Sequence, residues 1–461
     1  MKNHVRRGVS LGTIVMLALT CLVAVGLGYV LPKLMGSADI LMEDRAMRSS
    51  TNLNGALPEL ALKEIPIALA ESGPQGTSLP ENTQALPEMT PALSAQQTDA
   101  PAPAVPMAPK QGGTVSLTFG GSIVADDLIR KSGYYADSDK YDFTDNLSLI
   151  AEELDSDLTL VSVETITDPS RNVKQIPNAP ATIWDMLSIA NIDVVALGYS
   201  RAYDYGSSGL QATLNQAQKR GLSVIGAYES QEDADTIRFF EIDQVKIAYL
   251  HYTRSISSTG KKQMKSAGSS YAIPAAASDS DTYAIADDIA DARKQGADVV
   301  VVSLNWSGSE SLSTTSSKMT RFMQSLADAG ADIIVGAGTK AVREVEFLTS
   351  TSSDGSARKT LCIWSLGSLM NGERGNGNVT GMLVHVTLSH DGEALGFDSV
   401  TYTPTYIWRF KQDGQQRYRV VASDLPAPDG MDEDQADFAK RAFENLKNTL
   451  GDSPVSLRTP Q

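Results

Sequence analysis

The residues best placed to do chemistry follow a short apolar strand that we predict at residues 193–197. A turn of polar and small residues comes directly after it and contains Tyr199, Ser200, Arg201 and Asp204. Ligands and catalytic groups gather at the carboxyl ends of strands in an α/β sheet, because rigid elements hold the loops there beside a crevice. We therefore expect these four residues to lie at a site.

Polar and aromatic residues also follow three other predicted strands: Glu164 after residues 158–163, Asn305 and Trp306 after 298–304, and Lys340 after 333–335. His251 ends a further strand, and two interpretations of it stay open. It is a hydrogen-bonded residue of the core, or it belongs to the same site. If Arg201 and Lys340 leave positive charge unneutralised, the cleft is suited to an anionic chain end, with Tyr199 and Trp306 as flat walls.

The turn after residues 193–197 resembles a segment of the CapA family, the capsule and poly-γ-glutamate synthesis proteins whose domain belongs with the calcineurin-like metallophosphoesterases. That family has Ala-Asn-Asn-His, two residues, Asp, one residue and Gly. This chain has Gly198-Tyr199-Ser200-Arg201, followed by Asp204 and Gly206. The frame of the motif is present, whereas the Asn and His that bind metal in the family are not.

The family's other motifs follow in order between about residues 115 and 410. Its Gly-Asp corresponds to Gly120-Gly121, its Asn-x-Glu to Ser162-Val163-Glu164, its His-Trp-Gly to Asn305-Trp306-Ser307, its Gly-His-His-Pro-His to Gly336-Ala337-Gly338-Thr339-Lys340, and its Ser-Leu-Gly-Asn to Ser365-Leu366-Gly367-Ser368. The resemblance implies that nearly every metal ligand has been replaced.

Two-metal hydrolases clamp the attacking and leaving oxygens with cations that carboxylate, amide and imidazole groups hold. Only Glu164 and Asp204 remain here as oxygen ligands at the matched motifs, and two carboxylates do not hold a pair of metal ions. We therefore expect no metal and no other cofactor. Glu164 and Asp204 remain candidate catalytic residues only for an enzyme with an atypical site.

Carboxylates that are buried together need compensating charge, or they become protonated. Arg201 and Lys340 each stand where the family has His, so we predict that one or both fill the former metal volume and pair with Glu164 or Asp204. Three alternatives stay open. Both cations point into solvent, Asp204 shapes its turn or caps the following helix, or Glu164 is a surface residue.

Asp126 and Asp127 are acids close to the altered Gly120-Gly121 motif, and they could act as displaced ligands. They also stand where a helix is predicted to begin, and acidic residues are common there because they oppose the helix dipole. We favour the second interpretation. No nucleophile motif and no phosphate-binding glycine loop occurs in the sequence.

Alternating strands and helices after Thr114 predict an α/β sandwich, with sheets inside and helices outside. The resemblance implies that this sandwich is of the calcineurin-like metallophosphoesterase type. A helical stretch is expected at residues 145–154, and a hairpin at residues 237–250 that turns at Asp243-Gln244. We place the CapA-like domain at residues 114–410. Residues 411–461 then form a C-terminal extension with an amphipathic helix at residues 434–450.

The 23 uncharged residues Val9–Leu31 follow Lys2, Arg6 and Arg7. This length spans a bilayer, and the positive flank keeps the N-terminus in the cytoplasm. We therefore predict a cytoplasmic tip and anchor at residues 1–35, a single-pass protein of the cell membrane, and a main domain outside the cytoplasm. Cleavage after Ala38 is the alternative. Residues 36–113 hold ten of the 20 prolines and predict a disordered tether.

The formal net charge is −16, which argues against nucleic acid as a partner, because phosphate binding requires a basic surface. Two cysteines, Cys21 and Cys362, provide no disulfide framework.

The resemblance implies a membrane-tethered protein that binds or organises an anionic surface polymer or its synthase components. The alternatives are an active hydrolase or transferase that uses Glu164 and Asp204, and an adaptor or sensor ectodomain.

Overall fold

A computed structural model of the chain describes residues 113–173, 178–306, 317–352, 355–373, 375, 378–390 and 395–459. The predicted anchor and almost all of the predicted tether lie outside these residues, as does Ser307. Within the described part of the chain, no helix is both long and apolar enough to cross a bilayer.

The first sheet contains nine strands of the described residues. Its path runs in the order β16-β15-β14-β1-β4-β5-β6, with β13 beside β1 and β17 beside β15. β1 is parallel to β4 and β13 and antiparallel to β14. The strands are β1 (Gly113–Ile123), β4 (Leu158–Val163), β5 (Val194–Ala196), β6 (Ser223–Ile225), β13 (Ser368–Met370), β14 (Thr380–His390), β15 (Leu395–Gln412), β16 (Gln415–Ala422) and β17 (Ser456–Leu457).

The second sheet has the order β11-β12-β10-β9-β8-β7. Its four inner strands are parallel, and β7 and β11 run antiparallel at the edges. The strands are β7 (Arg238–Ile242), β8 (Val245–Thr253), β9 (Val299–Asn305), β10 (Ile333–Ala337), β11 (Val345–Thr351) and β12 (Ala357–Ile363). A small separate hairpin joins β2 (Tyr134–Tyr135) and β3 (Lys140–Tyr141).

The helices occupy the segments between the strands, as the alternating pattern predicts. They are α2 (Asp127–Ser132), α3 (Ile183–Ile189), α4 (Gly206–Gln218), α5 (Gln231–Asp235), α6 (Ser258–Ala267), α7 (Thr282–Lys294), α8 (Ser317–Ala329) and α9 (Glu433–Leu450). Five short 3-10 turns join them: η1 (Thr144–Asn146), η2 (Ser148–Ile150), η3 (Glu152–Leu154), η4 (Ser270–Ala272) and η5 (Asp279–Asp281).

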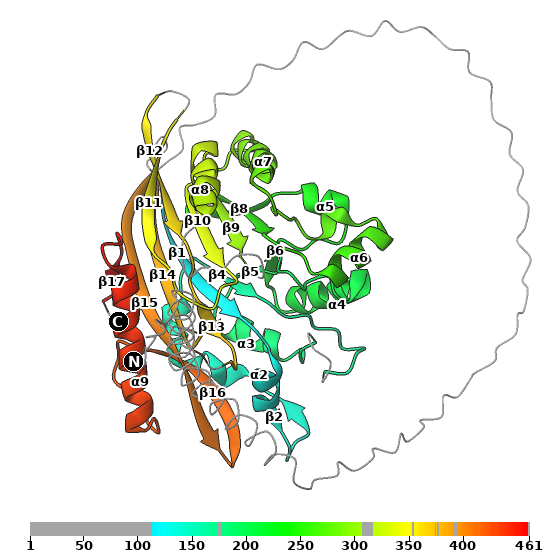
Figure 1. Ribbon diagram of the computed structural model, residues 1–461, viewed down its shortest axis with the longest axis vertical. Coiled ribbons are helices and arrows are strands. Elements are labelled where there is room, and N and C mark those ends of the chain that lie inside the picture. The colour runs from blue at the N-terminus through cyan, green and yellow to red at the C-terminus, as the bar shows by residue number, and fades with distance from the viewer. Residues whose placement is uncertain are drawn as a thin grey trace, which may run out of the picture. The chain divides into compact units, whose positions relative to one another are not determined.

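The two sheets face each other across an apolar interior, and helices cover their outer faces (Figure 1). Valines, leucines and isoleucines from β1, β4 and β14 meet those of β8, β9 and β10 in this interior. Helices α7 and α8 cover the outer face of the second sheet through a separate core that contains Phe322 and Trp306. The predicted α/β sandwich, with sheets inside and helices outside, is therefore confirmed.

The hairpin between β7 and β8 turns at Asp243 and Gln244, as predicted. Both residues have positive φ, 46° and 67°, which is the conformation that a two-residue hairpin turn requires. The helix expected at residues 145–154 is replaced by the turns η1 to η3. In this segment the Ser148 hydroxyl donates to the backbone and the side chain of Asp145, and such local bonds compete with a regular helix.

The first sheet continues across residue 410, the predicted end of the domain. β15 reaches Gln412 and pairs with β16 from Thr405↔Ala422 to Gln412↔Gln415. α9 forms within one residue of its predicted start, and it packs on β15 through Ala439, Ala442 and Leu446. The predicted extension is therefore continuous with the sheet, because its strand and its helix share apolar contacts with it.

Candidate functional site

The carboxyl ends of the inner strands of both sheets meet at one edge of the sandwich, where its interior changes from apolar to polar. Three serines stand side by side in register on three neighbouring strands of the first sheet: Ser122 on β1 pairs with Ser162 on β4 and with Ser368 on β13. All three are buried. The matched motifs therefore lie together in space, although they are far apart in the sequence.

Glu164 connects the two sheets at this edge. Its backbone N–H donates to Ile123 O at 2.9 Å, which fixes it beside β1. Its Oε1 accepts hydrogen bonds from the Ser122 hydroxyl and from Asn305 Nδ2 at the end of β9, both at 3.1 Å. The Ser122 oxygen in turn accepts from Gly338 N, after β10, at 2.9 Å. Donors from both sheets therefore already bind this carboxylate.

Burial raises the pKa of Glu164, because the ionised carboxylate loses its water. The hydrogen bonds from Asn305 and Ser122 and the charge of Lys340 act in the opposite direction but do not cancel the effect of burial. The alternative that Glu164 is an ordinary surface residue is therefore wrong. Its side chain is partly buried at the edge where the two sheets meet.

The turn after β5 is held by Asp204. Its Oδ2 accepts from Arg201 Nε at 2.8 Å, and its Oδ1 accepts from the hydroxyl of Ser257. The Asp204 side chain is 7% exposed and that of Arg201 is 46% exposed. Ser257 caps α6 by accepting from Gly260 N at 2.8 Å, and its N–H donates to Ser200 O at 2.7 Å. The predicted pairing of Arg201 with Asp204 is confirmed, and it ties the turn to α6.

Lys340 does not pair with either of the two matched carboxylates. Its Nζ contacts the carboxylate of Glu373, and both side chains are about half exposed. The prediction is therefore wrong for this residue, which reaches outward from its loop to a partner that the motif comparison did not include. Because Arg201 and Lys340 both have carboxylate partners, they do not leave the positive charge that an anionic ligand would need at this edge.

Tyr199 and Trp306 do not form walls of an open cleft. Trp306 is completely buried in the core under α7 and α8, and its Nε1 donates to Trp364 O at 2.9 Å. Tyr199 is 4% exposed, and its hydroxyl finds no hydrogen-bond partner among the described residues. Burial and the nearby carboxylates of Glu164 and Asp204 raise its pKa. Both rings are enclosed by the apolar cores and offer no exposed face, so their contact with a ligand stays a prediction.

His251 is a hydrogen-bonded residue of the interior. Its Nε2 lies 2.8 Å from Gly198 O and its Nδ1 lies 3.0 Å from the Ser303 hydroxyl. The imidazole fills the space that a side chain at Gly198 or Gly226 would need, so it packs directly on the turns after β5 and β6. Burial lowers its pKa to about 4, which keeps it neutral at physiological pH.

The sequence profile of a protein family described as "Bacterial capsule synthesis protein PGA_cap" matches residues 116–373, which is more than half of the chain. This chain belongs to that family. The predicted family resemblance is therefore confirmed, and the matched residues contain Glu164, Asp204 and every other residue of the candidate site.

Two relatives carry capsule-related names. The PGA biosynthesis protein CapA of Bacillus subtilis (strain 168) is 30% identical over 167 residues, which cover 36% of this chain and 41% of the relative. The capsule biosynthesis protein CapA of Bacillus anthracis is 29% identical over 147 residues, which cover 32% of this chain and 34% of the relative. The matched segments therefore span less than half the length of either protein.

Solved structures with a similar arrangement include the calcineurin-like phosphoesterase YfkN from Bacillus subtilis, with a TM-score of 0.38 and 13% identity over 73% of this chain and 98% of that one. A phosphatase structure titled with Mycoplasma pneumoniae has a TM-score of 0.36 and 13% identity over 63% of this chain and 93% of that one.

The residues of this family member do not fit a two-metal centre. Within the described ranges, no three His, Cys, Asp or Glu side chains come together as a group that could hold a metal ion. Ser162 and Ser368 stand where the family motifs have Asn, and their buried hydroxyls lack hydrogen-bond partners among the described residues. Glu164 and Asp204 are each bound by donors of the protein. We therefore derive no step that passes through a metal.

Asp126 is the N-cap of α2 and accepts hydrogen bonds from Leu128 N and Ile129 N at 2.9 and 3.0 Å. Its other oxygen accepts from Gly372 N at 2.7 Å. Asp127 pairs with Lys131 and Arg130 in the same helix. The interpretation of these acids as residues of a helix start is confirmed.

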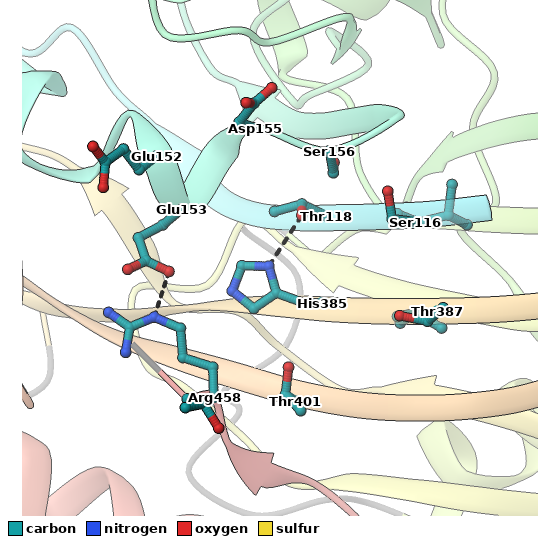
Figure 2. A pocket seen from close by; sticks show the side chains of 13 residues that line it. Ser116, Thr118, Glu152, Glu153, Asp155, Ser156, His385, Thr387, Thr401 and Arg458 are labelled. Carbon is teal, nitrogen blue, oxygen red and sulfur yellow. Dashed lines mark hydrogen bonds and ion pairs between the residues drawn. The ribbon is translucent and has the colours of Figure 1, made fainter. Parts of the chain in front are cut away.

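A second polar network lies at a cavity of about 260 Å³ beside β1 and β14, and the sequence analysis missed it (Figure 2). The His385 ring lies between two hydroxyls, with Nδ1 3.0 Å from Thr118 Oγ1 and Nε2 2.8 Å from Thr403 Oγ1. Thr403 donates its proton to Glu153 at 3.1 Å, so Nε2 must donate to Thr403 and Nδ1 must accept from Thr118.

Glu153 also pairs with Arg458, which bonds Asp424 at 2.8 Å. Figure 2 shows Glu153 reaching down from its turn to the guanidinium. The partners of this network come from distant parts of the chain, and no motif in the sequence points to them. Only the alternation of residues along β14 could have suggested that His385 faces away from the interior between the sheets.

Replacing Glu164 by glutamine should stabilise the protein at alkaline pH. A carboxyl group whose pKa is raised by folding favours the folded state only while it is protonated, and the benefit disappears as the pH rises through the folded-state pKa. Glutamine keeps the oxygen that accepts from Ser122 and Asn305 and carries no charge. Thermal unfolding at pH 8 should show a gain of about 1 kcal/mol, and at pH 4 a much smaller one.

The matched control is Glu164→Ala, which leaves the Ser122 hydroxyl and the Asn305 amide without their acceptor. That variant should lose about 1–3 kcal/mol at both pH values. A glutamine variant that is less stable than wild type at pH 8 would contradict the assignment of Glu164 as a buried and disfavoured carboxylate.

Proposed function

We propose that this capsule synthesis family member takes part in the biosynthesis or attachment of a capsule or poly-γ-glutamate-type surface polymer as a binding or organising protein, and that it does not cleave or transfer bonds. The main support for this proposal is that the motifs matched to the family have lost most of their metal ligands. Glu164 and Asp204 are bound by donors of the protein, and the neighbouring ligand positions hold serine, asparagine, arginine and lysine.

The names of the two Bacillus relatives support the polymer part of the proposal. The sequence of the anchor predicted at residues 1–35 supports a position at the outer face of the cytoplasmic membrane, since Val9–Leu31 has the length and the positive flank of a single-pass segment. The proposed partners are the anionic polymer and the components of its synthase. Because the protein carries a net charge of −16, most of its surface repels an anionic polymer, and binding requires a localised contact.

The test is deletion of the gene, which should abolish the surface polymer, followed by complementation of the deletion strain. Wild-type protein and the variant Glu164→Gln should restore the same amount of polymer. A working hydrolase or transferase would require the carboxylate as a ligand or as an acid or base, and its loss should then lower the rate by about 100-fold or more.

Two results would overturn the proposal. An intact surface polymer in the deletion strain would remove the role in polymer synthesis and would favour an adaptor or sensor ectodomain. Failure of Glu164→Gln to complement, at a wild-type protein level, would favour the active enzyme.

A further inference from the structure

The hairpin of β15 and β16 projects past the end of β14, and α9 runs beside it (Figure 1). The strand pairing defines this projection. Thr380, the first residue of β14, pairs with Tyr406 of β15, and β15 continues beyond this pair and pairs with β16 as far as Gln412↔Gln415. Together with α9 and residues that precede β14, this projection borders a cavity of about 570 Å³. A second cavity of about 590 Å³ continues along the same hairpin and shares Arg409 and Gln435 with the first. The two form one trough.

The first cavity of the trough is locally cationic in an acidic protein. Arg409 and Arg441 line it, and neither has a carboxylate partner among the described residues. Glu373, an acid of the same wall, is already paired with Lys340. The second cavity adds Lys411 but also two acids, Asp429 and Asp432, so the excess of positive charge belongs to the first cavity. Two arginines without partners, in a chain with a net charge of −16, favour an anionic ligand.

The walls of the trough also carry apolar rings at its open side. Phe438 of α9 is 54% exposed, and the Arg441 guanidinium lies 4.5 Å from the centre of its ring. Trp408 and Phe410 line the second cavity with their ring centres 4.4 Å apart, but Trp408 is only 2% exposed, so Phe438 is the ring that lies open to solvent. Stacking on a ring holds a guanidinium in place while its N–H groups remain available for a carboxylate. A trough with this lining fits a chain better than an isolated small ion.

We propose that the trough between α9 and the β15–β16 hairpin binds an extended chain that bears repeated carboxylates, and that Arg409 and Arg441 hold two of its acidic groups. This inference rests on the proposed polymer-binding function. It places the polymer-binding site in the trough and not at the edge of the sandwich that contains Glu164. At that edge, both cations of the matched motifs are neutralised by Asp204 and Glu373. In the first cavity of the trough, by contrast, Arg409 and Arg441 keep their charge without a carboxylate partner among the described residues.

The test measures binding of fluorescently labelled poly-γ-glutamate to the full-length protein by polarisation at low ionic strength. Wild-type protein should bind it, and binding should weaken as salt is added. The double variant Arg409→Gln/Arg441→Gln should bind at least about tenfold more weakly, since it loses two charge-assisted contacts. The matched control is Lys261→Gln/Lys262→Gln on α6, which changes the net charge equally and should alter affinity by less than about twofold.

Three results would count against the inference, and they differ in meaning. If the arginine variant binds as tightly as the lysine control, the trough is not the site, while the polymer-binding function stands. If wild-type protein binds poly-γ-glutamate no better than it binds a neutral polyglutamine of the same length, the binding function itself fails. If poly-α-glutamate binds and poly-γ-glutamate does not, the ligand is an acidic protein segment and not the polymer.

Discussion

Replacing Arg458 by methionine should lower the free energy of unfolding by about 3–5 kcal/mol. Arg458 is 8% exposed and neutralises two carboxylates, Glu153 and Asp424, whose side chains are 17% and 3% exposed. Methionine preserves much of the volume and removes the charge, so both acids would remain in the interior without a cation. They must then be ionised at a high cost or become protonated.

Denaturant unfolding at pH 7 measures this loss. The matched control is Lys294→Met, since Lys294 pairs with Asp291 in an exposed setting, where both side chains are more than half exposed. That change should cost less than about 1 kcal/mol. The triple variant Arg458→Met/Glu153→Gln/Asp424→Asn should recover most of the stability, because it no longer buries an unpaired charge. A loss for Arg458→Met no larger than that of the control would contradict the assigned network.

Acidification from pH 7 to pH 4 should cost about 3 kcal/mol of stability for each of two histidines. Burial lowers the pKa of His251 and of His385 from 6.5 to about 4. The folded state therefore binds fewer protons than the unfolded state between these values. The stabilising contribution is complete above pH 6.5 and is lost as the pH falls towards 4.

The unfolding free energy should be measured between pH 4 and pH 7 for wild type, for His251→Gln and His385→Gln, and for the double variant. Each variant loses hydrogen bonds and should be less stable at pH 7, but its stability should fall less steeply with acidification. The two reductions in slope should add, because the histidines lie in separate networks. If the slope of the double variant equals that of wild type, the buried neutral histidines are wrongly assigned.

The sequence was sufficient to predict the strands and helices that place the candidate site. The apolar runs before Glu164, Tyr199 and Asn305 form β4, β5 and β9, and their carboxyl ends converge as α/β topology requires. The pairing of Arg201 with Asp204 could also be predicted, because the two residues are three positions apart in one turn. Contacts between residues only a few positions apart in one turn follow from their spacing in the sequence.

Contacts that depend on side-chain direction could not be predicted in the same way. Trp306 follows β9 but turns into the core under α7 and α8, and Lys340 reaches Glu373, which lies in a separate loop. The network of His385, Glu153 and Arg458 joins residues separated by up to 305 positions. Neither periodicity nor motif comparison contains this information, because tertiary packing alone brings these groups together.

The most direct measurement of the central claim is the metal content of the full-length protein after exposure to excess Mn²⁺ or Zn²⁺ and removal of free metal. The account predicts no stoichiometric divalent metal, and the same trace content in wild type and in Glu164→Gln, because the Glu164 carboxylate is already bound by Ser122 and Asn305. One or two ions per wild-type chain, lost in Glu164→Gln, would contradict it.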